Sequence, residues 1–223
     1  MAHPSRLTVP TPGAQLTVAA ASLAVSPILA SWTQRLIDDE RHHWWYPRRV
    51  RPERWLAVTM VATGLALLGA RGTPAFLWWL LATCGTVLAL VDAQTYRLPA
   101  RLVGPLAMTG AITLAVTAAV YDEPHRLLRA ALAAALIATI WLVVALISPS
   151  AMGMGDVYLA GITAGALGWA GWPEVILGQL AAWLFAPLVM AAVAIGRPDN
   201  RGLRMRVPMG PALLAGAISV CLL

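Results

Sequence analysis

The sequence contains no lysine, only two cysteines and few charged residues. Its 223 residues are 59% hydrophobic and 12% charged, with a mean hydropathy of +0.71. A soluble domain of this length needs more surface charge, so the composition indicates a polytopic membrane protein. The net charge of +6 does not indicate nucleic-acid binding. The 16 basic residues are all arginine and lie in short loops between apolar segments, as expected of residues that set membrane topology.

The scarcity of cysteine and histidine excludes several kinds of site. Cys84 and Cys221 lie far apart in apolar runs, so they form neither a disulfide framework nor a zinc pattern. Among the four histidines, only His42 and His43 are close together, and this adjacent pair is more typical of a headgroup-level loop than of a metal site. The sequence offers no Ser-His-Asp set, Cys-His set or glycine-rich phosphate loop. We therefore expect no metal, no cofactor and no nucleic-acid partner.

Eight apolar runs can be placed as membrane spans, which typically need about 17–25 residues. The predicted fold is therefore all-α, with eight transmembrane helices near residues 14–34, 55–70, 75–91, 102–121, 127–147, 157–173, 174–195 and 209–223. The first run could be mistaken for a signal peptide. The far more basic segment after it favours a retained anchor with its N-terminus outside.

The distribution of arginine supports this orientation. The predicted inner loops are 35–54, 92–101, 148–156 and 196–208, and they hold 12 of the 16 arginines. This bias obeys the positive-inside rule. We divide the chain into three parts: a tail with the first helix (1–34), a short basic cytoplasmic loop (35–54) and a membrane domain (55–223).

Two of the ten acidic residues stand apart from the arginine-rich loops and outer turns. Asp92 ends the apolar run LATCGTVLALV, and Asp156 opens the run VYLAGITAGALGW. Both fall at the inner membrane face, on the third and sixth predicted spans. Lone carboxylates at matching depth are typical of a paired-acid site. Each acid could instead cap a helix end, and this alternative is strongest for Asp156, because aspartate favours helix N-termini.

Glycines surround the second acid. Gly153 and Gly155 remove side chains on both sides of it, so backbone or a bound peptide can approach the carboxylate closely. Downstream, Gly161 and Gly165 form a face of small residues for tight helix packing, which Gly168 extends. We expect this face to bring another span, and its acid, against the span that carries Asp156.

Two carboxylates can activate water without a metal. One, ionised, takes a proton from water, while the other, protonated, donates to the substrate carbonyl. Held close together they resist double ionisation and share one proton. The pair therefore predicts aspartic peptide hydrolysis at the membrane.

Three motifs carry a family resemblance. They are GMGD at 153–156, DAQTYRLP at 92–99 and VPMGPALLAGA at 207–217. In this order they resemble the motifs of the type IV prepilin peptidases, the GxGD membrane aspartyl proteases of bacteria. The resemblance implies a multi-pass protein of the bacterial inner membrane. Such a protein removes the short leader of prepilins or pseudopilins at the cytoplasmic face.

Many members of that family also methylate the new N-terminus with S-adenosylmethionine and carry a cytoplasmic loop with two CxxC pairs. The equivalent loop here, 35–54, is short and has no cysteine. N-methylation, and with it a need for S-adenosylmethionine, is therefore not expected.

The resemblance also implies roles for individual residues. Asp92 and Asp156 would form the catalytic dyad, and Gly153 and Gly155 would admit the extended backbone of the substrate. Four more residues are expected to bind the substrate or shape its path, with plain structural roles as the alternative: Thr95, Pro99, Gly210 and Pro211.

Two other classes of function stay open at this point. A transporter or proton-relay protein also places acids in its spans, usually near the midplane with broken helices in two repeats, and the sequence shows no such repeat. A non-catalytic subunit of a pilus or secretion assembly could keep the same fold, but it would not need both aspartates and both glycines. Presenilin-like proteases share the Gly-x-Gly-Asp pattern, but their first aspartate normally follows a tyrosine, and here Val91 precedes Asp92.

Overall fold

The computed structural model describes residues 75–95, 100–148, 153–195 and 209–220, together with residue 20. Apart from residue 20, the first two predicted spans and the 35–54 loop lie outside these residues, so they stay predictions. The predicted span 209–223 is described as far as residue 220.

All regular secondary structure in the described part of the chain is α-helical. Its six helices are α3 (Ala75–Thr95), α4 (Ala100–Tyr121), α5 (Pro124–Ile147), α6 (Met154–Ala170), α7 (Trp172–Ile195) and α8 (Met209–Val220). They correspond in order to the last six predicted spans, which confirms the all-α fold for these residues.

Three of these helices contain stretches long and apolar enough to cross a membrane: Val103–Tyr121, Pro124–Ile147 and Trp172–Ala191. Phe76–Ala89 and Met209–Val220 are shorter apolar helices. These stretches indicate a membrane protein.

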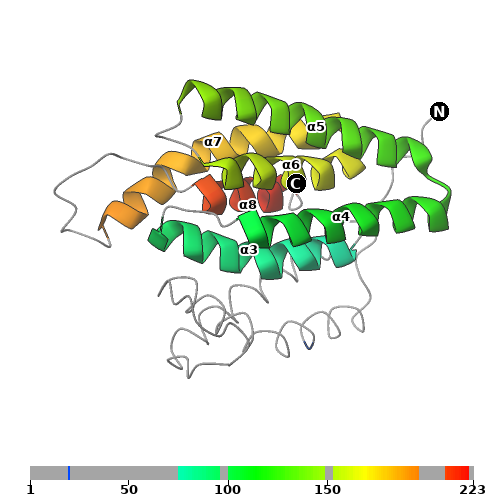
Figure 1. Cartoon of the computed structure of the whole chain (residues 1–223), viewed down its shortest axis with the longest axis horizontal. Helices are drawn as coiled ribbons and strands as arrows, with labels where there is room; N and C mark the ends of the chain where they lie inside the picture. The colour runs from blue at the N-terminus through cyan, green and yellow to red at the C-terminus, as the bar shows by residue number, and fades with distance from the viewer. Residues whose placement is uncertain (1–19, 21–74, 96–99, 149–152, 196–208, 221–223) are drawn as a thin grey trace.

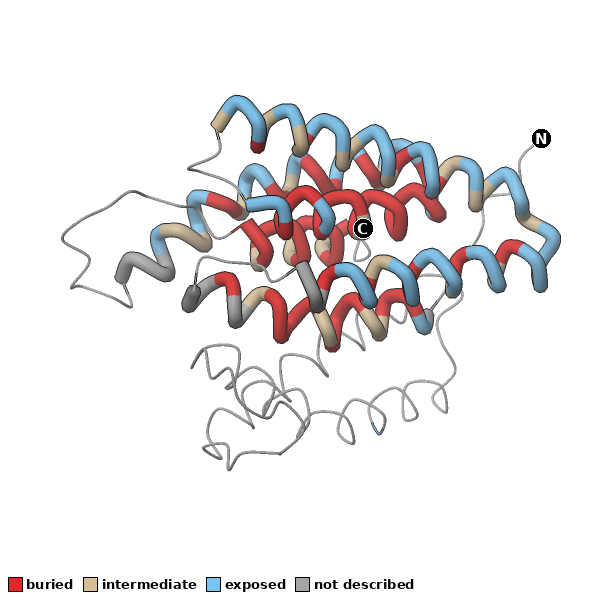
Figure 2. The backbone as a smooth tube through the Cα atoms, viewed as in Figure 1, coloured by how far each residue is buried: buried red, intermediate tan, exposed pale blue. Residues whose placement is uncertain are grey.

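Helices α6 and α8 lie at the centre of the bundle, where most of their residues are buried (Figures 1 and 2). The outer helices α4, α5 and α7 instead expose large apolar side chains along much of their length. Leu132 and Leu136 of α5 and Leu180 and Leu184 of α7 are examples, each more than half exposed. A lipid environment solvates such faces, whereas water would not.

Small residues let α6 approach α5 closely. A Cβ atom added to Gly168 would lie 2.7 Å from the Cβ of Ala133, and Gly161 and Gly165 face Ala138 and Ala134 in the same interface. The predicted small-residue face therefore exists. The expectation that it would bring a second acid against α6 was wrong, because its partner is α5, a helix without any acidic residue.

Replacing Gly168 with alanine should destabilise the fold by about 1–3 kcal/mol, because the added methyl overpacks the interface. Thermal unfolding of the purified protein in micelles would measure the loss. Gly165→Ala is the matched control, since its Cβ would meet Ala134 at an ordinary 3.4 Å and alanine favours the helix. Equal unfolding temperatures for the two variants would contradict the packing argument.

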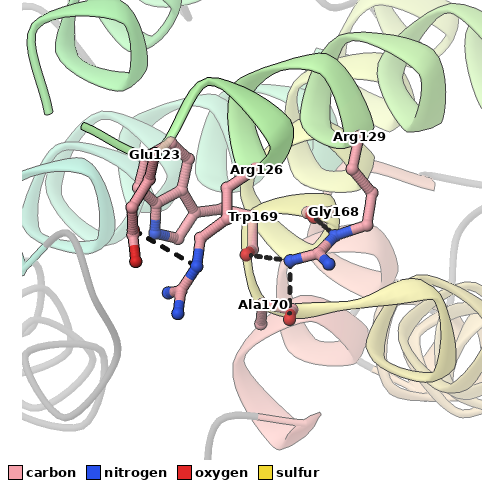
Figure 3. A network of polar contacts seen from close by, with 6 residues as sticks. All are labelled: Glu123, Arg126, Arg129, Gly168, Trp169 and Ala170. Carbon is pink, nitrogen blue, oxygen red and sulfur yellow. Dashed lines mark hydrogen bonds and ion pairs between the residues drawn. The ribbon is translucent and has the colours of Figure 1, made fainter. Parts of the chain in front are cut away.

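Arg129 of α5 caps the C-terminus of α6 (Figure 3). Its Nε donates to the carbonyl of Gly168 at 2.7 Å, and one terminal nitrogen donates to the carbonyls of Trp169 at 2.7 Å and Ala170 at 3.0 Å. The last carbonyl oxygens of a helix have no N–H donor within the helix. A cation at this end also complements the helix dipole. Arg129 therefore joins α5 to the C-terminal end of α6, which is the end farther from Asp156.

Arg129→Met should lower the free energy of unfolding by about 1.5–3 kcal/mol, the usual contribution of hydrogen bonds to a charged group. Arg126→Met is the control on the same helix. Its Nε pairs with Glu123 at 3.2 Å on a part-exposed surface, where ion pairs contribute about 0–1 kcal/mol. The prediction fails if chemical or thermal unfolding ranks Arg126→Met as the more damaging change.

Candidate functional site

The two candidate acids come from the ends of two helices that contact each other. Asp92 lies in the last turn of α3, and Asp156 lies in the first turn of α6. Both are buried, with exposed fractions of 3% and 6%. The charge of Asp156 acts on the Asp92 carboxyl. The structure thus brings Asp92 and Asp156 within electrostatic reach of each other, inside the bundle.

Asp156 is held by the backbone that begins its own helix. Gly153 is the N-cap residue of α6, and its N–H donates to Oδ2 of Asp156 at 3.0 Å. In return, the N–H of Asp156 donates to the carbonyl of Gly153 at 3.1 Å. The bond from the cap N–H to an acid three residues later is one half of a capping box; glycine has no side chain to form the other half, and its carbonyl accepts the second bond instead. The capping interpretation of Asp156 is therefore correct for one of its two oxygens.

The other oxygen of Asp156 differs from Oδ2 in its surroundings. Oδ1 is buried and has no hydrogen-bond partner among the residues that the structure describes. A buried carboxylate oxygen without a donor is costly, so proteins keep one mainly where a ligand or reaction uses it. Oδ1 is suited to accept a proton or a hydrogen bond from water or substrate.

Gly153 is exposed, and its backbone does not require a glycine. Its φ of −97° and ψ of 157° are accessible to any residue, and a Cβ atom there would lie 3.7 Å from Oδ2 of Asp156, an ordinary contact. What glycine adds is open space beside the carboxylate. Gly155, in contrast, is buried within the first turn of α6.

Asp92 is held by a different helix. The N–H of Gly210, the second residue of α8, donates to Oδ2 of Asp92 at 2.9 Å. Gly210 is buried and lies directly beside Asp92, and the following Pro211 is half-buried. Thr95 is the last residue of α3. Pro99 lies outside the described residues.

Sequence reasoning placed these residues near the site but missed their main-chain bonds. The spacing of Gly153 and Asp156 does match the acid half of a capping box, so the bond from the Gly153 N–H could have been predicted from the motif. The bond from Gly210 to Asp92 joins residues 118 positions apart, and no local pattern signals it. Within the described ranges, no group of three or more His, Cys, Asp or Glu side chains is placed to hold a metal ion.

Two buried carboxyls, with the charge of Asp156 acting on Asp92, can perform general acid–base chemistry on water. A comparison with protein families is consistent with that chemistry. A family model described as "Type IV leader peptidase family" matches residues 75–196, more than half of the chain, a range that contains both acids. No curated protein and no solved structure gives a significant match.

Proposed function

The chain belongs to the type IV leader peptidase family, and we propose that it is a membrane aspartic endopeptidase acting on type IV prepilins or pseudopilins. Membership of the family identifies a protease. The finer assignment rests on one observation: Asp92 and Asp156 are buried together, with one oxygen of each held by a glycine N–H.

The proposed reaction uses the free oxygen of Asp156. Oδ1 accepts a proton from a water molecule, whose oxygen attacks the carbonyl carbon of the scissile peptide bond, while Asp92 donates a proton to the carbonyl oxygen. The tetrahedral intermediate then loses its C–N bond. Asp156 returns its proton to the departing amine, and Asp92 recovers its own proton as the carboxyl group of the leader forms. Both acids thus end in their starting protonation states.

For the substrate, we propose an extended peptide that enters past the exposed Gly153, where the missing side chain leaves room for its backbone, while the buried Gly155 would let the peptide pack closely against the first turn of α6. Thr95, Pro99, Gly210 and Pro211 would line its path. The leader would be removed without N-methylation, because the 35–54 loop lacks cysteine. S-adenosylmethionine is therefore not part of the proposed reaction.

The proposed setting is the inner membrane of a bacterium. Eight spans with the N-terminus outside would place both acids at the cytoplasmic face, where the prepilin leader is accessible. The concentration of arginine in the predicted inner loops supports this orientation. The peptidase unit would comprise residues 55–223, preceded by the first helix and the basic loop.

Purified protein in liposomes, mixed with a panel of prepilins and pseudopilins, tests the proposal. Intact-mass spectrometry should detect the mature pilin and the free leader, with an unmethylated N-terminus even when S-adenosylmethionine is present. Protein-free liposomes are the control. A pH-sensitive dye in the same vesicles tests the transporter alternative. Proton flux without cleavage of any substrate would refute the peptidase assignment. A methylated product would refute the proposal that the leader is removed without N-methylation.

A further inference from the structure

We infer that Gly210 is a positioning residue for Asp92, acting through its backbone N–H at the start of α8. The inference rests on the proposed function, because it concerns the placement of one catalytic acid. It starts from the 2.9 Å hydrogen bond that joins the Gly210 N–H to Oδ2 of Asp92 in the buried interior.

The end of α3 has no backbone donor to orient a carboxyl group. Asp92 lies in the last turn of this helix, where the free backbone groups are carbonyls rather than N–H groups. The negative end of the helix dipole is also unfavourable for an anion. Asp156 has the opposite situation, since the N-terminus of α6 supplies a donor from its own chain three residues away. The donor for Asp92 therefore has to come from another element.

The start of α8 is suited to supply that donor. Its first N–H groups have no acceptor within the helix, and the dipole there favours a negative charge. Prolines at 208 and 211 carry no N–H, so only Met209 and Gly210 can donate among these four residues. One of these two amides is the group that binds Asp92.

Close packing fixes where that amide lies. A Cβ atom on Gly216 of α8 would come within 2.6 Å of the backbone nitrogen of Ala182 in α7, so these two backbones are in close contact. On the other side, Leu214 of α8 fills the space left by Gly85 of α3. Most residues of α8 are buried. The amide is thus held by a packed helix, and it fixes the Asp92 carboxyl group from outside α3.

Replacing single amides by esters tests this assignment. Incorporating glycolic acid at position 210 by nonsense suppression exchanges the N–H for an oxygen without adding a side chain. Freed from its donor, the Asp92 carboxyl group can rotate, and a misplacement of about 1 Å can lower a rate by about 10²-fold. We expect kcat for leader removal to fall by about that factor and KM to change much less, because the lost hydrogen bond is to the acid and the ester alters no side chain along the substrate's path.

The same exchange at Gly216 is the matched control. Its N–H belongs to the interior of α8, so the ester removes a helical hydrogen bond that the ester at position 210 leaves intact. The Gly216 variant should unfold at a lower temperature yet keep the wild-type kcat. A kcat loss at position 216 equal to or larger than that at position 210 would reduce Gly210 to a structural role and overturn the inference.

A spectroscopic measurement keeps the inference testable without any activity. In protein labelled with ¹⁵N-glycine, the Gly210 amide resonance should move when Asp92 is replaced by alanine, while those of Gly178 and Gly216 stay in place. An unmoved Gly210 resonance would overturn the inference. Because this result does not depend on cleavage, it separates failure of the positioning role from failure of the peptidase proposal, which would show as an inactive unmodified protein.

Discussion

Replacing Asp92 with asparagine is expected to lower the rate of leader removal by at least about 10⁴-fold, as losses at groups that act together in catalysis do. Asparagine can neither hold nor transfer the proton. Its carbonyl oxygen can still accept the hydrogen bond from Gly210, so the site should keep its shape. Cleavage would be followed by quantitative mass spectrometry with purified protein in liposomes.

A matched control for this change is Asp122→Asn. Asp122 is an exposed acid in the turn between α4 and α5, and asparagine tolerates its positive φ of 53° well. This variant should cleave at the wild-type rate. If Asp92→Asn cleaves as fast as Asp122→Asn, Asp92 is not a catalytic acid.

Replacing Asp156 with glutamate is the second large effect we expect. Glutamate is well suited to this position of a capping box, and its longer side chain can still reach the Gly153 N–H. The fold should therefore persist, as judged by the unfolding temperature. The added methylene displaces the carboxylate from its reacting position, so kcat should fall by about 10²-fold or more.

This substitution separates the two interpretations of Asp156. A residue that only caps α6 would accept glutamate with no effect on cleavage. A residue that also takes a proton from water through Oδ1 would not, because that atom has to be in place. Wild-type kcat for Asp156→Glu would favour the capping role alone.

Hydropathy predicted the order of the described helices, but α3 continues to Thr95 beyond the predicted end at 91, and α5 and α6 begin at Pro124 and Met154, before the predicted 127 and 157. The predicted spans 157–173 and 174–195 meet inside an apolar run, whereas α6 ends at Ala170 and α7 begins at Trp172. Gly171 separates them, and Pro173 suits the first turn of α7, where a missing N–H is tolerated. Apolar content does not detect such a break, because glycine and tryptophan are as compatible with lipid as their neighbours.

Local pattern also explains how much of the site could be predicted. The acid and glycines of GMGD belong to one helix start, so their spacing already contains the capping geometry. The Gly210 bond to Asp92 and the Arg129 cap on α6 join distant segments and exist only once the helices are packed. For the same reason the small residues of α6 predicted close packing but not its partner, since the alanines of α5 offer a matching surface that a single span cannot reveal.

The central claim is that Asp92 and Asp156 act as one catalytic unit, and a double-mutant cycle tests it most directly. Rates of leader removal would be measured by mass spectrometry for the wild type, Asp92→Asn, Asp156→Asn and the double variant, all in the same liposomes. Groups that act as a unit are non-additive, so the account predicts that either single variant is about as inactive as the double. A single variant that keeps the wild-type rate, or a double variant whose loss is the product of two modest single losses, would contradict it.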